Sequence, residues 1–138
     1  MPNDNGSLLL GLDGVVVDWV QIDDDRTRTV HVLTRADCVG ACPLCGGRSS
    51  RSKGWVCTRP RDIKIGPDRP QIVWRKRKWL CTNVCCERKH FTESVPGVPP
   101  RARVTVRAKA EMALAVLDDD RSVKSVASAY GTTWNVCH

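Results

Sequence analysis

The sequence is poor in aromatic residues and has no long apolar run. The first shortage limits the size of the hydrophobic core, and the second argues against a membrane protein. Only five Trp, one Tyr and one Phe occur among 138 residues, so the core is thin and a metal ion would help to stabilise it. No apolar run approaches the length of a membrane span, and the N-terminus lacks the layout of a signal peptide. We therefore expect a cytoplasmic chain with no membrane contact. In that reducing compartment, paired cysteines are more often metal ligands than disulfides.

Most of the cysteines gather in two groups. The first is Cys42-Pro43-Leu44-Cys45 followed by two glycines, and the second begins at Cys81 about 35 residues later. Two thiolates separated by two residues suit one edge of a tetrahedral zinc site, and the second group supplies the other edge, as in a zinc ribbon. The spacing predicts a structural Zn²⁺ held by Cys42, Cys45, Cys81 and a fourth ligand, for which the residues offer Cys85, Cys86 or His90.

The remaining cysteines in this part of the chain and the two runs of aspartate could also bind metal, but we expect them to have structural roles. Cys38 and Cys57 stand apart from the two groups, and we expect each to be a small buried apolar residue. The acidic run 23–25 is expected to be a solvated turn, and the run 118–120 a helix end. The even count of eight cysteines leaves a disulfide scaffold as the alternative to zinc.

Charge is divided unevenly along the chain. Residues 1–37 hold seven Asp and three Lys or Arg, for a net charge of −4, whereas residues 38–138 hold nineteen basic and eight acidic residues, for +11. A strongly basic segment is typical of proteins that bind a polyanion, because summed charge governs affinity for phosphates. A basic surface that serves only solubility is the simpler alternative.

The hydrophobic pattern predicts an α+β fold: a small antiparallel β zinc-ribbon module followed by a helix-turn-helix that is cut short. Residues 1–7 are expected to be unstructured, and strands are expected at 8–22, 28–34, 54–61 and 71–80. In the last strand, Ile72 and Trp74 should face one side, with Val73, Arg75 and Arg77 on the other.

A helical period begins after a proline-rich stretch. Residues 104–117 suit an amphipathic helix, Ser122 can cap a second helix, and Thr133 can cap a third. This order is typical of a helix-turn-helix, although a generic helical hairpin fits it as well. The third helix would offer Thr133, Asn135 and His138 to a major groove, and the chain ends one turn into it, so we expect a fragment. The expected domains are a hairpin at 1–37, a zinc ribbon at 38–95, a linker at 96–103 and the helix-turn-helix at 104–138.

The ordered combination of motifs resembles the N-terminal region of ISL-three-type insertion-sequence transposases. The resemblance rests on the Cys42–Gly46 knuckle, the Arg61-Asp62 pair, the basic strand running into Cys81, and the segment 130–134 near the end. In that family the last two ligands have four residues between them, which favours Cys86 over Cys85. Lys76 departs from the family pattern, which usually has an aliphatic residue there, and it could open that face of the sheet.

The resemblance implies a DNA-binding function without catalysis. The family's catalytic domain, with its Asp/Asp/Glu triad, would lie beyond residue 138, and a closed four-cysteine site has no open coordination position. The expected partner is double-stranded DNA at terminal inverted repeats, together with a second copy or a full-length transposase, at the nucleoid and with no small-molecule substrate. Phosphate contacts are expected from Arg75, Arg77, Lys78, Arg101, Arg103 and Arg107. Two alternatives stay open: a short zinc-dependent repressor or competitor of the full-length enzyme, and a protein-interaction module.

Overall fold

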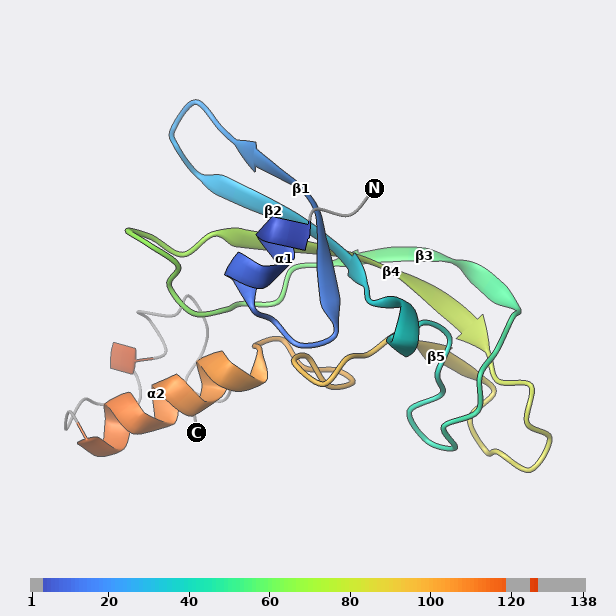
Figure 1. Ribbon diagram of the computed structural model, residues 1–138. Coiled ribbons are helices and arrows are strands. Elements are labelled where there is room, and N and C mark those ends of the chain that lie inside the picture. Colours follow the sequence, from blue (N-terminus) through green and yellow to red (C-terminus); the bar gives the residue numbers. More distant parts are fainter. Residues whose placement is uncertain (1–3, 119–124, 127–138) are drawn as a thin grey trace.

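The computed structural model describes residues 4–118 and 125–126, and it combines one mixed sheet with two helices (Figure 1). A short 3₁₀ turn at Ala36–Cys38 follows the first hairpin. The elements are α1 (Asp4–Leu10), β1 (Val15–Ile22), β2 (Arg28–Thr34), β3 (Ser52–Thr58), β4 (Gln71–Leu80), β5 (His90–Thr92) and α2 (Val106–Asp118). The predicted α+β class is confirmed.

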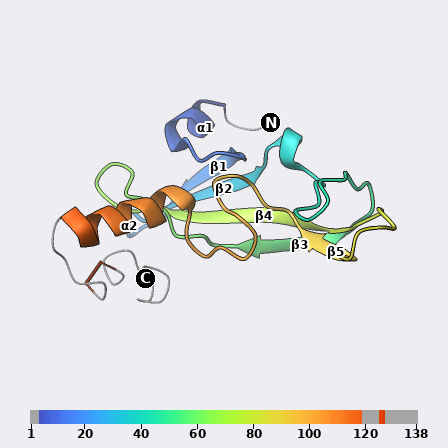
Figure 2. The same cartoon turned by 90° about the horizontal axis from the view of Figure 1, so that it is seen from below.

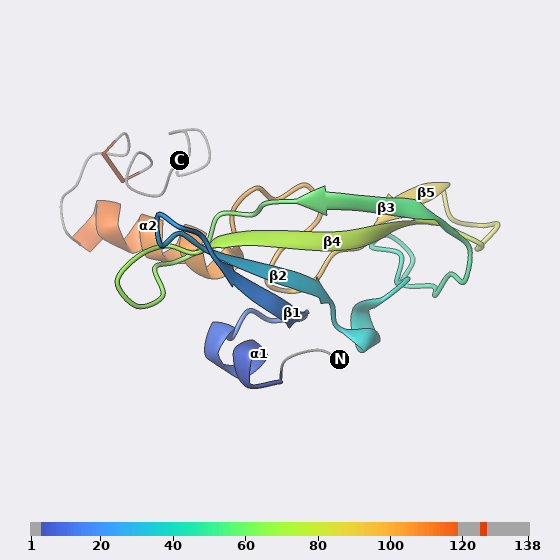
Figure 3. The same ribbon diagram turned by 90° about the horizontal axis from the view of Figure 1, so that it is seen from above.

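Strand β4 is the centre of the sheet. The strand order is β1-β2-β4-β3, and β5 pairs with the far end of β4 (Figure 3). Strands β3 and β5 are antiparallel to β4, as expected for a zinc ribbon, whereas β2 lies parallel to β4. The N-terminal hairpin therefore shares a sheet with the ribbon, and the division into domains at residues 37, 95 and 103 stays a prediction.

The main core lies on one face of β1, β2 and β4. The strand alternation predicted for the hairpin places Val30 and Val32 in this core, and Ile72 and Trp74 join them from β4. A register shift in β1 between Val17 and Trp19 interrupts the alternation there. Trp19 is consequently half exposed and stacks on His31 of β2, with ring centroids 3.9 Å apart.

The structure differs from the sequence-based expectation at the N-terminus. Residues 1–7 were expected to be unstructured and residues 8–14 to begin a strand, but residues 4–10 form α1. Leu10 is buried in the main core, and the Ser7 hydroxyl accepts a hydrogen bond of 2.8 Å from the Val17 amide. Tertiary contacts with β1 thus stabilise a helix too short to be evident in the sequence.

The proline-rich stretch expected as a linker is packed in its first part. Val95 and Val98 pair with each other and are buried in the main core. Gly97 approaches the first loop so closely that a Cβ atom there would lie 2.8 Å from the Asp13 carbonyl oxygen. The chain therefore reaches α2 from an anchored position rather than from a free tether.

Helix α2 begins at a buried polar clamp. The Asp62 carboxylate accepts hydrogen bonds from the Thr105 hydroxyl (2.6 Å) and from Nε and Nη2 of Arg107 (2.9 and 2.5 Å). Arg107 Nη1 also donates to the Leu10 carbonyl, at 2.7 Å. The apolar side of the helix, Ala108, Met112 and Ala115, packs with Val104 and Val126 in a second core. Figure 2 shows α2 at one end of the sheet and the cysteine loops at the other.

Candidate metal centre and nucleic-acid interface

Two loops bring four cysteine sulfurs together at one end of the sheet. The first loop follows the 3₁₀ turn, and the second connects β4 to β5; they lie next to each other at the right of Figure 1. In the first loop the Gly46 amide donates to the Cys42 carbonyl at 2.8 Å, and Gly46 has a φ of +72° that favours glycine. In the second, the Cys86 amide donates to the Asn83 carbonyl at 3.0 Å. Each loop is therefore a tight turn that aims its thiols inward.

The sulfur positions fit a tetrahedral zinc site. The Sγ atoms of Cys42, Cys45, Cys81 and Cys86 all lie within 4.8 Å of one another. Cys42 and Cys86 are 4.0 Å apart, and Cys45 and Cys81 are 3.7 Å apart. Four sulfurs placed about 2.3 Å from one zinc ion would be separated by about 3.8 Å. The site is closed by four ligands, so it suits a structural ion.

The thiols compete for negative charge when no cation lies between them. The amide of Gly47, 3.4 Å from Cys45 Sγ, lowers the pKa of Cys45 to about 7. For Cys81, a hydrogen bond from the Asn83 backbone lowers the pKa, but burial and the thiols of Cys45, Cys86 and Cys42 outweigh it and raise the value to about 12. Near neutral pH, Cys45 is thus partly ionised while Cys81 keeps its proton. A divalent cation removes this conflict.

The other candidate ligands lie outside this cluster. Cys85 and His90 are exposed and do not join the four sulfurs. Cys38 is half-buried against the main core, in line with its expected apolar role. The expectation for Cys57 is wrong, because this residue is exposed in β3. Strand β3 lies at the edge of the sheet, and a sequence pattern does not reveal which strand takes that position.

A small apolar cluster supports the cysteine loops. Trp79 of β4 and Phe91 of β5 are paired across the strands, and both are buried together with Cys42. Cys81, Cys86 and Val39 pack against the same cluster. The loops therefore rest on one face of the β4–β5 pair, and the metal site and the sheet stabilise each other.

The predicted phosphate contacts on β4 do not share one face. Arg75 and Arg77 point to the side opposite the main core, and both guanidinium groups lie 4.3 Å from the ring centroid of Trp55 on β3. Lys78, one position on, points to the reverse side of the strand. Local sequence patterns do not predict Trp55 as a stacking partner; only the β3–β4 register, which pairs Trp55 with Arg77, reveals it.

Lys76 does not open the sheet as expected. Its side chain is half-buried and its Nζ lies 4.3 Å from the Trp74 ring centroid, so it covers that ring. Burial lowers the pKa of Lys76, and the nearby charge of Glu93 partly opposes this. The departure from the family pattern is thus accommodated by the aliphatic stem of the lysine.

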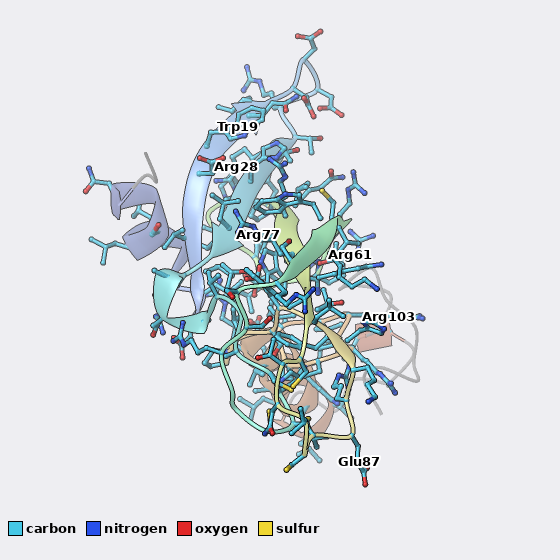
Figure 4. The ribbon with its side chains drawn as sticks, turned by 90° about the vertical axis from the view of Figure 1, so that its right-hand side faces the viewer. Trp19, Arg28, Arg61, Arg77, Glu87 and Arg103 are labelled. Carbon is cyan, nitrogen blue, oxygen red and sulfur yellow. The ribbon has the colours of Figure 1, made fainter. Side chains whose placement is uncertain are left out.

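Arg101 and Arg103 are exposed at the approach to α2. The Arg61 amide donates to the Arg103 carbonyl at 2.9 Å, which brings a further arginine next to them. Figure 4 shows Arg61 and Arg103 on the same side of the molecule. Both predicted residues are therefore available to a polyanion, in company with Arg61.

Arg107 is placed differently from the prediction. Its guanidinium is held by the Asp62 carboxylate and the Leu10 carbonyl, so we assign it to the clamp and withdraw it from the phosphate contacts. Helical periodicity alone could not show this, because the partners lie 45 and 97 residues away. Thr133, Asn135 and His138, expected to read bases, lie outside the described residues.

Comparison with known families identifies both halves of this arrangement. Residues 39–86 match the family described as the zinc-finger of transposase IS204/IS1001/IS1096/IS1165, and residues 93–138 match the helix-turn-helix domain of transposase family ISL3. The chain has the zinc ribbon and the helix-turn-helix domain of the ISL3 transposases. No curated protein and no solved structure matches it.

The ribbon match and the four-cysteine cluster together indicate structural Zn²⁺. They explain why an ISL3 chain with so thin a core can order its cysteine loops. Within residues 4–118 and 125–126, no helix is long and apolar enough to cross a membrane.

Proposed function

We propose that this ISL3 chain is the DNA-binding region of a transposase and recognises the terminal inverted repeats of its element. The observation that supports it best is the pairing of a four-cysteine zinc ribbon with a helix-turn-helix match on the basic part of the chain, which carries a net charge of +11. Such charge supplies affinity for phosphates, and a helix-turn-helix supplies base readout.

The zinc ion has a structural role in this proposal. Cys42, Cys45, Cys81 and Cys86 ligate it and hold the two loops against Trp79 and Phe91. A closed thiolate site offers no position for water or substrate, so in this proposal the zinc ion takes no part in catalysis and the chain only binds DNA. Cutting and joining of DNA belong to a carboxylate site of the kind that two-metal phosphoryl transfer requires.

The proposed DNA contacts come from three places. Arg75, Arg77 and Lys78 on β4 and Arg101 and Arg103 before α2 contact phosphates, while Thr133, Asn135 and His138 read base edges. Phosphate contacts determine affinity and register, whereas base contacts determine sequence preference. A second copy or a full-length transposase is the protein partner, because two inverted repeats present two equivalent sites. The protein acts at the bacterial nucleoid, in the cytoplasm.

Fluorescence anisotropy on the zinc-loaded chain tests the proposal. The probes are a labelled duplex carrying an element end and a scrambled duplex of the same composition. We expect the element end to bind at least about tenfold more tightly, with both affinities falling as salt rises. Equal affinity for the two duplexes at every salt concentration would contradict recognition of the ends and leave only general DNA affinity. No binding to either duplex would contradict the DNA-binding function itself.

A matched pair of variants separates the two contributions. The Arg101→Gln/Arg103→Gln variant should weaken binding to both duplexes by a similar factor, because phosphate contacts carry no sequence information. Arg26→Gln, at the exposed tip of the N-terminal hairpin, serves as the control and should leave both affinities unchanged.

A further inference from the structure

The two faces of the β4–β5 pair are chemically different. Trp79 and Phe91 face the cysteine loops and are buried. The alternating residues Lys78 and Thr92, which pair with each other, point to the opposite face, and so does His90 opposite Leu80. The zinc loops therefore occupy one face and leave a polar, basic face behind the site.

A groove of about 440 Å³ lies on this second face. It is lined by Lys53, Lys78, Arg88, His90, Phe91 and Thr92. Lys53 comes from the register shift at the start of β3, which adds a residue between the pairs made by Ser52 and Gly54. The described lining thus has three permanent cations, a histidine, a hydroxyl and one phenylalanine, and it contains no carboxylate.

The groove is held in shape and is open to a ligand. The Nε of Arg88 donates to the His90 carbonyl at 3.1 Å, which fixes the guanidinium beside the strand. Lys53, Lys78 and His90 are exposed. The nearest acidic neighbour in sequence, Glu87, points away from the body of the protein at the tip of the loop (Figure 4). The positive charge of this groove is therefore uncompensated along its lining.

We propose that this groove binds the phosphate backbone of a DNA duplex. The inference rests on the proposed function and adds Lys53, Arg88 and His90 to its contacts. The groove is open, and its charged and hydrogen-bonding side chains come from β3, β4, β5 and the loop between β4 and β5. Side chains of this kind dominate contacts with nucleic-acid phosphates. The zinc site lies on the opposite face of the β4–β5 pair, where it keeps these two strands at a fixed separation.

The salt dependence of binding tests the groove directly. The zinc-loaded full chain is titrated with a random-sequence duplex of about 30 base pairs, from about 50 to 200 mM KCl. The test variant is Lys53→Gln/Arg88→Gln. The matched control, Arg26→Gln/Lys64→Gln, removes the same charge from two exposed residues outside the groove. Because each lost phosphate contact lowers the slope of log Kd against log salt by about 0.9, the test variant should lose about 1.8 and the control almost nothing.

A second variant guards against misfolding. Lys53→Gln/Lys78→Gln should also lower the slope by about 1.8, while zinc content and circular dichroism confirm that each variant is folded. If the wild-type chain binds DNA and both folded groove variants show the same slope of log Kd against log salt as the wild type, the groove is not a DNA contact, although the proposed function still stands. A wild-type chain that binds no DNA overturns both. If the control variant loses as much of this slope as the groove variants, the effect is one of general charge, and this outcome also contradicts the proposal that the groove binds DNA.

Discussion

Single residues decide which sulfurs can reach the metal. Cys85 and Cys86 are adjacent, yet only Cys86 joins the cluster, because the turn closed by the Asn83 carbonyl directs its side chain inward. The Cys85 amide instead donates to the Asn83 side chain at 3.0 Å, and its thiol is exposed. The choice between these neighbours is therefore made by the backbone of one turn.

Serine replacement at these two positions gives a direct test. Cys86→Ser should lose stoichiometric zinc, because three thiolates and a hydroxyl bind the ion far more weakly. Cys85→Ser should retain it, and Cys57→Ser in β3 serves as a second control. Metal analysis after gel filtration makes the measurement. Retention of zinc by Cys86→Ser together with its loss from Cys85→Ser would reverse the assignment.

Among the elements, α2 depends on a clamp made by distant segments. Asp62 lies in the connection between β3 and β4, its side chain is fully buried, and it receives three hydrogen bonds from Thr105 and Arg107. The parallel bridge between Arg61 and Val104 places these residues opposite each other. The first turn of α2 is thus anchored to the sheet by charge and hydrogen bonding, in addition to its apolar side.

Asp62→Asn should weaken this anchor substantially. Asparagine removes the charge that faces Arg107 and leaves a partly buried guanidinium without its counter-ion. We expect a loss of about 2 kcal/mol or more in the free energy of unfolding, measured with urea. Hydrogen exchange should also accelerate in residues 105–118.

Asp68→Asn is the matched control for the clamp. Asp68 forms an ion pair with Arg28 in which the carboxylate is exposed, whereas the Asp62 carboxylate is fully buried. Exposed pairs contribute about 0–1 kcal/mol, so this variant should change the stability much less. Equal losses in the free energy of unfolding for the two substitutions would show that burial of Asp62 adds nothing to the stability of the clamp.

At the scale of the whole molecule, stability is divided between two regions. The main core under α1 contains none of the four clustered cysteines, whereas the Trp79–Phe91 cluster packs directly against Cys81 and Cys86. The metal therefore stabilises one end of the sheet, and hydrophobic burial stabilises the other.

Removal of zinc should reveal this division. After treatment with a strong chelator, we expect rapid hydrogen exchange in residues 39–50 and 81–92, while residues 15–34 keep most of their protection. Affinity for DNA should fall, because β4 and β5 lose their fixed separation. Unchanged protection of both cysteine loops in the chelated protein would contradict a structural role for the ion.

Zinc affinity should also depend on pH in a defined direction. Zinc must displace the proton of Cys81, whose pKa is about 12, at any working pH, so affinity falls as pH falls. Above pH 7, Cys45 is already largely a thiolate, since its pKa is about 7. Below that value it too must release a proton, and the slope of log Kd against pH should steepen by about one unit. Competition with a chromophoric chelator measures this, and a slope that stays constant through neutral pH would contradict the low pKa of Cys45.

Much of the fold and the metal site could be predicted because the signals are local. The span of β4, the alternation of Ile72 and Trp74 with Val73, and the helical period of α2 all depend on neighbours within a few residues. Cysteine spacing works in the same way, since two short turns determine where the thiols can point. These features follow from backbone periodicity and turn chemistry, which the sequence alone determined.

Only the tertiary structure decided which charges are available for binding. Arg107 and Arg103 look equivalent in the sequence, but a carboxylate from the β3–β4 connection engages one and leaves the other exposed. Arg77 and Lys78 are adjacent, yet one stacks on Trp55 and the other lines the groove behind the zinc loops. Long-range pairing sets these outcomes, because a side chain's partner across the sheet can lie many residues away. Local patterns carry no information about such a partner.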